Sequence, residues 1–341
     1  MEQKKKKQHY VPQFYLRSWG IPEKNRIFVY DKVLERKRIS NIRDVASENY
    51  FYDVDLKEML SESEIEELKD GGLPWRDDLI QYFERAFDET VEQPFSVLLR
   101  NTIEKANSAT PWHLNNCFFI SSEKKLEFSG YLAFQFLRTK RARNNLMETS
   151  SCLRQVLSDM GASQKTIEEY SLSSKGAKYI HLNMLLNTDQ LNEVANLFKD
   201  LIWILGVNRS QTKLFTSDNP IGTRAHLHHP LMPLNGLASK GVEAFYPLSP
   251  SLVLIMLDGT YHTHWVPFDR YYIEITDSKR IDSYNSILAL QSERFVFSSD
   301  GSFSTIEKLK QEDPDIFKRG HSLMRWGRKT YYPNQESSTD D

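Results

Sequence analysis

The chain has 341 residues, of which 40% are apolar and 26% are charged, and this composition excludes an extended disordered protein. A chain of this length forms one large domain or two smaller ones. The 44 Lys and Arg side chains nearly balance the 46 Asp and Glu side chains, so a generally basic nucleic-acid-binding surface is excluded, whereas a local basic patch is not.

The N-terminal part of the chain predicts short elements of mixed type. The segment His9–Gly20 is expected to form a short helix that begins at Pro12, because proline suits the first helical turn. The runs IFVYD and KRIS flank a polar connection in Arg26–Ser40 and predict a β-hairpin, and Ser47–Val54 predicts a further strand. The charged segment Ser61–Asp70 predicts a helix.

The middle of the chain predicts a series of helices. From Trp75 to Asn107, apolar residues recur every three or four positions, which is typical of an amphipathic helix, and Pro94 is expected to disturb it. Ser108–Ser122 is expected to be a loop. Further helices are predicted over Glu123–Asn145, Ile167–Leu186 and Asp189–Gly206.

The last third changes to short β-like runs that are separated by turn residues. Strands are predicted in KLFTSDNP, EAFYPLSP, SLVLIML and RYYIEIT, followed by a helix over Asp277–Gln291 and a strand over Arg294–Ser299. This order predicts an α+β fold, in which the helical middle packs with the strand-rich C-terminal third and a small N-terminal β-hairpin. We expect a single domain over residues 1–328, which can be divided into a mainly helical part (1–206) and a strand-rich part (207–328), and a polar tail over 329–341.

Several classes of protein are excluded by what the sequence lacks. No GxGxxG, GxxxxGK[ST], GxSxG or HExxH motif occurs. Cys117 and Cys152 are too few and too far apart for a disulfide framework or a cysteine zinc site. The basic run Lys4–Lys7 has no apolar stretch behind it, and no apolar window approaches the roughly 20 residues of a membrane span. We therefore expect a cytoplasmic protein without a membrane partner.

The first polar motif is QHYVPQFYL, at the start of the first predicted helix. Free backbone N–H groups at a helix N-terminus attract anions. His9 could act there as a general acid or base or contact a phosphate, with Gln13 in the first turn. The alternative is that His9 is an ordinary residue at the beginning of a helix.

The second motif lies in the predicted helix Glu123–Asn145. Glu127, Tyr131, Gln135 and Arg138 are spaced by 4, 4 and 3 residues and therefore share one face. The segment RTKRAR, which begins at Arg138, adds four cations to the end of this pattern. Arg138 could clamp a phosphate or carboxylate with its planar guanidinium, and the alternative is a solvated basic helix end.

The third motif, TSDNP, follows a β-like run. Pro220 restricts Asn219 to extended conformations, so the loop geometry is well defined. Asp218 could orient a catalytic histidine, bind a metal or accept a hydrogen bond from a substrate hydroxyl. The alternative is a turn in which Asp and Asn bind their own backbone.

Five further histidines lie in two short groups. These are His226, His228 and His229 in AHLHHP, and His262 and His264 in YHTHW. The i, i+2 spacing suits a transition metal, but no carboxylate or cysteine lies at a companion spacing. A metal site at these histidines is therefore disfavoured.

The three polar motifs together resemble the DUF4238 family, a mostly bacterial family of unknown function. HYVPQFYLRSWG, QFLRTKRAR and FTSDNP occur here in the family's order, PLSPSLVLIM and Asn285 are also similar, and the resemblance covers roughly residues 8–300. Its motif positions are His9, Pro12, Gln135, Arg138, Ser217, Asp218, Asn219 and Pro220. Family members often have proline after the Arg-Thr pair, whereas this chain has Lys140, so we expect the helix to continue past it.

The resemblance favours convergence of these polar residues on one site. We expect an enzyme with a pocket between the helical middle and the strand-rich third, in which His9 is the acid or base, Asp218 orients it or binds a metal, and Arg138 clamps an anionic group. The expected substrate-binding residues are Gln13, Gln135, Tyr131, Ser217 and Asn219. The cofactor is left open, with a divalent metal as the candidate.

Three functions compete for this site. The leading hypothesis is hydrolysis of a phosphate-containing substrate, a nucleotide or nucleic acid, with a role in bacterial defence. The second is a non-catalytic sensor or interaction module that binds a small anionic ligand through the same residues. The third is a polar core network that fixes the fold.

Overall fold

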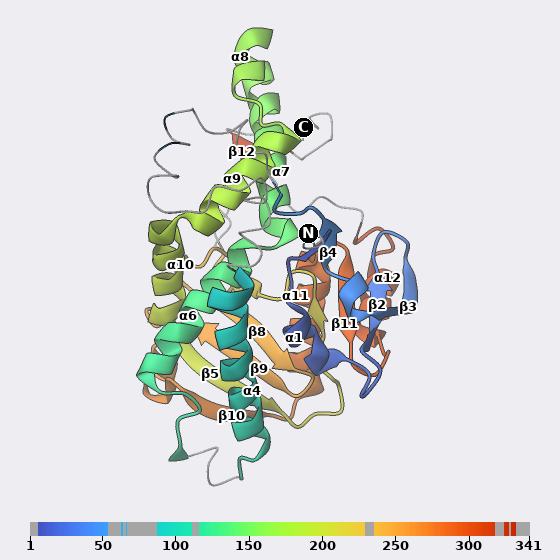
Figure 1. Cartoon of the computed structure of the whole chain (residues 1–341), viewed down its shortest axis with the longest axis vertical. Helices are drawn as coiled ribbons and strands as arrows, with labels where there is room; N and C mark the ends of the chain where they lie inside the picture. The colour runs from blue at the N-terminus through green and yellow to red at the C-terminus, as the bar shows by residue number, and fades with distance from the viewer. Residues whose placement is uncertain are drawn as a thin grey trace.

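The computed structural model describes residues 6–53, 63, 66, 87–110, 116–228, 235–317, 324–326 and 329–331. These residues form an α+β fold, in which helices from the middle of the chain cover a sheet formed by the last third (Figure 1). The predicted fold class is therefore confirmed. Among the described residues, no helix has both the length and the apolar character that crossing a membrane requires.

The main sheet has five strands in the order β10–β5–β9–β8–β7. Neighbouring strands are antiparallel except β10 and β5, which are parallel. The strands are β5 (Ile202–Asn208), β7 (Gly222–Ala225), β8 (Val242–Ser249), β9 (Leu252–Leu257) and β10 (Tyr271–Ile275). The predicted strands in EAFYPLSP, SLVLIML and RYYIEIT are thus confirmed.

Both faces of the main sheet are buried, because helices cover each of them. Trp203 and Leu205 pack on one face with α4 (Gln93–Asn107) and α6 (Ser122–Leu137). Ile202 and Ile204 pack on the other face with α11 (Ser278–Gln291), which confirms the predicted helix. Successive residues of a strand point to opposite faces, so a strand that is covered on both sides is apolar throughout.

A second sheet joins the two ends of the chain. Its four antiparallel strands have the order β3–β2–β11–β6. They are β2 (Arg26–Asp31), β3 (Arg36–Asn41), β6 (Thr216–Ser217) and β11 (Phe295–Ser298). The predicted N-terminal hairpin is present as β2–β3, and it belongs to one sheet with strands of the last third.

The N-terminal segment contains the short helix that was predicted to begin at Pro12 and to end at Gly20, and a strand precedes it. Residues Lys7–His9 form strand β1, which pairs with β4 (Ser47–Asn49) in a separate two-stranded sheet. Only Gln13–Leu16 (α1) is α-helical, and it continues as a 3-10 turn, Arg17–Trp19 (η1). His9 is therefore the last residue of a strand that was not predicted, and it lies ahead of the helix that begins after Pro12, as expected.

The helix predicted over Glu123–Asn145 is two helices. α6 ends at Leu137, and α7 (Lys140–Asp159) begins after Thr139. The side-chain oxygen of Thr139 accepts a hydrogen bond from the Ala142 N–H (3.2 Å), which is the bond of a helix N-cap. The expected continuation of the helix past Lys140 is therefore wrong, because the cap lies one residue earlier.

Two other predicted helices also end early. The helix predicted over Asp189–Gly206 ends at Asp200, and the apolar run that follows is strand β5. The helix predicted over Ile167–Leu186 is divided where the Ser173 side chain caps a new helix. The helices concerned are α8 (Gln164–Glu169), α9 (Ser174–Leu186) and α10 (Thr188–Asp200).

Other elements complete the fold. The disturbance expected at Pro94 is present, because α4 follows a π-helical turn, Asp88–Glu92 (η4). Elements that were not predicted are η2 (Ile42–Asp44), η5 (Thr263–Phe268), α12 (Ser304–Glu312), β12 (Met324–Trp326) and β13 (Lys329–Tyr331). The predicted helix Ser61–Asp70, apart from residues 63 and 66, the first part of Trp75–Asn107 and residues 332–341 of the polar tail lie outside the described residues.

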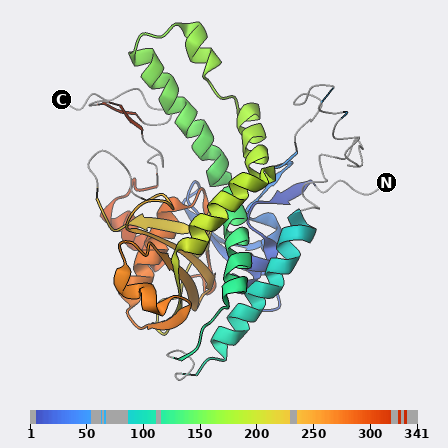
Figure 2. The ribbon, with the colours of Figure 1, turned by 90° about the vertical axis from the view of Figure 1, so that its left-hand side faces the viewer.

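Helices α7, α8 and α9 extend away from the sheets as an arm (Figure 2). α9 packs against α7 within the arm, and α10 returns along α6 to the main sheet. The base of the arm therefore lies beside the N-terminal strands β1 and β4, where the chain turns from α6 into α7 (Figure 1).

The cap at Thr139 is expected to contribute to stability. Thr139→Ala removes the acceptor of the Ala142 N–H and should lower the free energy of unfolding by about 1 kcal/mol. Thr139→Ser keeps the oxygen and should retain most of that stability. Urea denaturation of both variants measures the difference, and equal stability of the two would contradict the assigned cap.

Candidate functional site

Arg138, the expected clamp for a substrate anion, is bound by groups of the protein itself. Its NH2 donates to the His9 carbonyl oxygen (2.6 Å), and its Nε donates to Tyr52 Oη (3.2 Å). Its NH1 donates to Glu92 Oε1 (2.7 Å). Although burial disfavours the charge, the neighbouring Tyr52 and Glu92 raise the pKa of Arg138. With 2% of the residue exposed, this arginine fastens β1 to the end of α6.

The polar stripe of α6 faces the N-terminal segment. Gln135 Nε2 donates to the Tyr10 carbonyl oxygen (3.1 Å), and Gln135 Oε1 accepts from Tyr131 Oη (3.2 Å). Together with Arg138, these side chains hold the backbone at His9 and Tyr10. The structure therefore brings four predicted site residues together, namely His9, Tyr131, Gln135 and Arg138, and it does so in a buried network.

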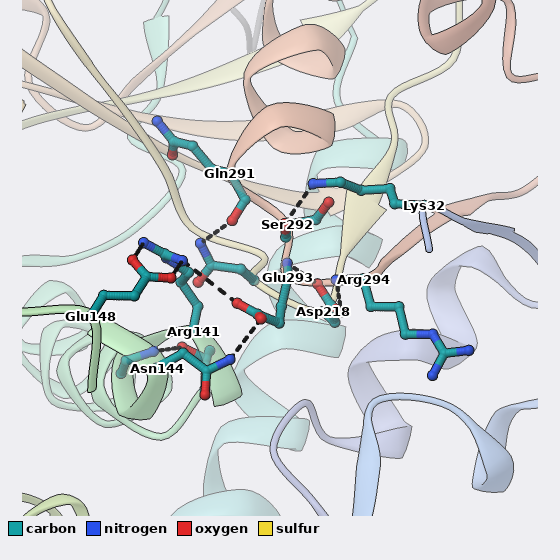
Figure 3. Close-up of polar contacts among 12 residues, drawn as sticks. Lys32, Arg141, Asn144, Glu148, Asp218, Gln291, Ser292, Glu293 and Arg294 are labelled. Atoms are coloured by element: carbon teal, nitrogen blue, oxygen red, sulfur yellow. Dashed lines mark hydrogen bonds and ion pairs between the residues drawn. The ribbon is translucent and has the colours of Figure 1, made fainter. Parts of the chain in front are cut away.

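Asp218 is completely buried and binds the backbone that enters β11. Its carboxylate accepts N–H hydrogen bonds from Glu293 (2.8 Å), Arg294 (2.7 Å) and Phe295 (2.8 Å). Burial raises the pKa of Asp218 to about 6, against the effect of these donors. Figure 3 shows this carboxylate beside the backbone of residues 293 and 294.

The rest of the TSDNP motif binds the same stretch of chain. Ser217 Oγ donates to the Asn219 carbonyl oxygen (2.7 Å), and Asn219 Nδ2 donates to the Gln291 carbonyl oxygen (3.1 Å). Tyr10, whose carbonyl oxygen accepts from Gln135, is buried, and this burial together with the charges of Asp218 and Glu48 raises the pKa of its side chain. Gln13, the first residue of α1, is half-buried and makes no hydrogen bond to either group.

A cleft of about 790 Å³ lies at the base of the arm. Its walls are formed by the segment from β4 to residue 53, the first turns of α7, the first turns of α9, and Glu293. Four basic side chains line it: Lys140, Arg143, Lys175 and Lys178. Its acidic and aromatic lining residues are Glu48, Asp53, Glu148, Glu293, Tyr50 and Tyr179. None of the eight predicted site residues lines this cleft.

The three sequence motifs nevertheless hold the walls of the cleft. β1 pairs with β4, which carries Glu48 into the lining. Arg138 fixes the end of α6 two residues before Lys140, the first residue of α7. Asp218 binds the backbone N–H of Glu293, the last lining residue. The predicted site residues are therefore positioning residues for the cleft.

Arg143 lines the cleft and is bound by groups of the protein interior. Its guanidinium lies 3.6 Å from the centroid of the Phe51 ring, and NH2 donates to the Phe51 carbonyl oxygen (2.7 Å) and to His181 Nδ1 (3.2 Å). Burial lowers the pKa of Arg143 to about 10. Its Nε is buried and makes no hydrogen bond within the described part of the chain.

His181 is held in its neutral form behind Arg143. Its Nε2 donates to the Leu137 carbonyl oxygen (2.8 Å), so its Nδ1 is left to accept from Arg143. Burial and the charge of Arg143 lower the pKa of His181 to about 3. A second proton on this ring would face the guanidinium.

Glu293 is bound by two side chains from the first turns of α7. Its Oε1 accepts from Asn144 Nδ2 (2.6 Å), and its Oε2 lies 3.7 Å from Arg141 NH1. Arg141 in turn binds both oxygens of Glu148 (2.9 and 3.0 Å). Figure 3 shows Glu293 extending toward Arg141 and Asn144. Its Oε2 is buried and accepts no hydrogen bond from the described residues.

Only part of this cleft was visible in the sequence. The basic run RTKRAR, which the sequence places at the end of a predicted helix, contains Lys140 and Arg143. Lys175 and Lys178 are three residues apart on α9, a spacing that places them on one face, and that signal was available. Glu293 has no motif of its own, because its position follows from a backbone hydrogen bond to Asp218.

Two of the five further histidines, His226 and His262, lie close together, and His226 packs beside the buried carboxylate of Glu243. His226 Nε2 lies 2.6 Å from Glu243 Oε2, and the rings of His226 and His262 are 4.7 Å apart. Arg224 also binds Glu243. No group of three or more His, Cys, Asp or Glu side chains that could hold a metal occurs among the described residues, which leave out His229.

Comparison with known proteins identifies the family. Residues 7–302 match the family described as protein of unknown function (DUF4238), and the chain therefore belongs to this family. No curated protein and no solved structure matches the chain. The predicted family is thus confirmed, and its description carries no activity.

Replacing Arg138 should test its structural role. Arg138→Lys keeps the charge but loses the three-way contact, so the free energy of unfolding should fall by about 3 kcal/mol. Arg209→Lys, at an exposed ion pair with Glu274, is the matched control and should change it by about 0.5 kcal/mol at most. Urea denaturation decides, and equal stability of the two variants would refute the role of Arg138.

Neutral His181 should make the fold sensitive to acid. The unfolded chain protonates this ring below its ordinary pKa of 6.5, whereas the folded protein does so only near pH 3. The stability that the neutral ring contributes is present above pH 6.5 and is lost as the pH falls, by about 2 kcal/mol at pH 5. His181→Gln should be correspondingly less sensitive between pH 7 and 5 in urea denaturation; an unchanged pH dependence would contradict this assignment.

Proposed function

We propose that the protein binds a phosphate-containing ligand, of the nucleotide or nucleic-acid class expected from the sequence, in the cleft at the base of the arm. The observation that carries this proposal is the convergence of Lys140, Arg143, Lys175 and Lys178 on one cleft. Burial and the nearby charge of Arg143 both lower the pKa of Lys178. An anion bound between like charges that are held this close reduces their mutual repulsion and stabilises their charged forms.

Four acidic side chains equal the four basic ones of the lining in formal charge, but each of them is held by another group of the protein, as Asp53 is by Gln8 Nε2. Glu148 is held by Arg141, which lies outside the lining, and Glu293 is held by Asn144. Glu48 forms an ion pair with Lys140 (2.9 Å) in which both side chains are more than a third exposed. Such an exposed pair is weak and can exchange for a phosphate.

Two helices begin at this cleft, which adds to its affinity for anions. Lys140 is the first residue of α7, and Ser174 and Lys175 are the first two residues of α9. The first backbone N–H groups of a helix have no partner within it, and the helix dipole favours negative charge at that end.

Hydrolysis of the bound phosphoester is a second candidate function, and Glu293 is the observation that favours it. Arg141 and Asn144 orient its carboxylate, while the buried Oε2 accepts no hydrogen bond from the described residues. A carboxylate held in this way suits a general base that activates water. A role in bacterial defence would follow from such nuclease activity, and we propose it on that basis. We also propose a divalent metal as the cofactor of the hydrolysis, and the activity measurement below includes it.

The two cysteines support a cytoplasmic location. Cys117 and Cys152, the two cysteines of the sequence, form no disulfide with each other. So few cysteines, without a disulfide framework, are typical of a reducing compartment, and on this ground we propose that the protein acts in the cytoplasm.

Binding is tested by calorimetric titration with inorganic tripolyphosphate, ATP and a single-stranded oligonucleotide. The double variant Lys175→Ala/Lys178→Ala should weaken binding at least about tenfold, because charge-assisted hydrogen bonds are lost. Lys199→Ala, an exposed lysine of α10 outside the cleft lining, is the control and should bind as wild type does. If no anion binds, or if the double variant binds equally well, the proposal is wrong.

A measurement of product release, made beside the same titrations, separates a sensor from an enzyme. For a hydrolase, Glu293→Gln should keep the ligand affinity and abolish product release in the presence of Mg²⁺ or Mn²⁺. If wild type binds the ligand and releases no product with either metal, the protein is a sensor, and the hydrolytic candidate is discarded.

A further inference from the structure

We infer that the cleft recognises a nucleotide by stacking its base on Tyr50, an inference that rests on the proposed phosphate-binding function. Tyr50 follows strand β4 and lines the cleft together with the four basic residues. It remains 43% exposed, although the two residues that follow it, Phe51 and Tyr52, are buried in the core. The ring is thus a large aromatic surface beside positive charge.

The backbone at Tyr50 is held in a costly conformation. Its φ angle is 55°, in the left-handed region that bulky residues rarely adopt. The Tyr50 N–H donates to the Lys6 carbonyl oxygen (2.8 Å), and Lys178 Nζ donates to the Tyr50 carbonyl oxygen (2.5 Å). Glycine would fit this position without strain, so a tyrosine here indicates a use for its ring.

The groups around the ring match the two parts of a nucleotide. Lys178 binds the backbone of Tyr50 itself, so the basic wall of α9 begins directly beside the ring. Lys6 Nζ lies 5.9 Å from the centroid of the ring. A base that stacks on Tyr50 would therefore place its phosphates toward Lys178 and Lys175, which line the same cleft. Stacking accepts any base, because every base presents a π face.

This arrangement separates nucleotides from phosphorylated ligands that have no base. Both kinds of ligand meet the basic side chains, but only a nucleotide gains the stacking contact. Alanine substitution of a stacking residue typically weakens binding by about 5- to 150-fold. The cleft should therefore prefer ATP to inorganic tripolyphosphate, a ligand with a similar set of phosphate charges.

Calorimetric titration of Tyr50 variants with ATP and with tripolyphosphate tests the inference. Tyr50→Gly should weaken ATP binding by about 5-fold or more, leave tripolyphosphate binding unchanged and keep or raise the melting temperature, because the left-handed strain is relieved. Tyr50→Phe keeps the ring and should bind ATP as wild type does. Tyr170→Leu, an exposed tyrosine outside the cleft lining, is the matched control.

The outcomes distinguish this inference from the proposed function. If ATP and tripolyphosphate bind equally well and Tyr50→Gly changes neither affinity, stacking on Tyr50 is refuted while the anion cleft stands. If neither ligand binds wild type, the proposed function itself fails, and the inference fails with it. If Tyr50→Gly weakens both ligands equally, Tyr50 shapes the cleft and does not contact a base.

Discussion

The guanidinium of Arg138 joins segments that are far apart in the sequence, and the cleft depends on that join. It binds the His9 carbonyl oxygen at the end of β1 and the Glu92 carboxylate just before α4. Because β1 pairs with β4, and because Arg138 stands between α6 and α7, one side chain fixes two walls of the cleft. Lysine has no planar fork and cannot make this set of contacts. The three polar motifs of the sequence act here mainly by binding backbone, which places other residues around the cleft.

The wall of the cleft that contains Glu293 depends on the buried carboxylate of Asp218, which binds the Glu293 backbone N–H. The stability of this part of the fold therefore depends on pH. Burial raises the pKa of Asp218 to about 6, whereas burial and Arg143 lower that of His181 to about 3. As the pH falls from 6 toward 4, the folded state takes up a proton at Asp218 more readily than the unfolded state does, which stabilises the fold. His181 has the opposite effect, because only the unfolded chain protonates it in this range. Two buried groups, each bound to a lining residue of the cleft, thus change the stability of the fold with opposite sign as the pH falls.

The sequence predicted those elements whose patterns are local. Strands β8 and β9 and helix α11 were found within a few residues, because apolar runs and turn residues bound them. The sequence predicts a helix over most of strand β5, since a strand that is covered on both faces shows no alternation of polar and apolar residues. The sequence predicts that His9 and Arg138 lie in one site, with both side chains taking part. The contact is made through a backbone carbonyl, which leaves no pattern in residue types, and for the same reason Glu293 was not found.

Because the N-terminal hairpin pairs with β11, the four-stranded sheet cannot form until the last third of the chain has been synthesised. Strand β2 finds its partner in β11, and Asp31 binds Arg294, 263 residues later. During synthesis at about 5 to 20 residues per second, the hairpin therefore waits on the order of tens of seconds for its neighbour. Throughout that interval one edge of β2 is unpaired and able to pair with another chain. The last third of the protein consequently ends this exposure as soon as it leaves the ribosome, and a chain truncated before β11 would keep an open edge at its N-terminus.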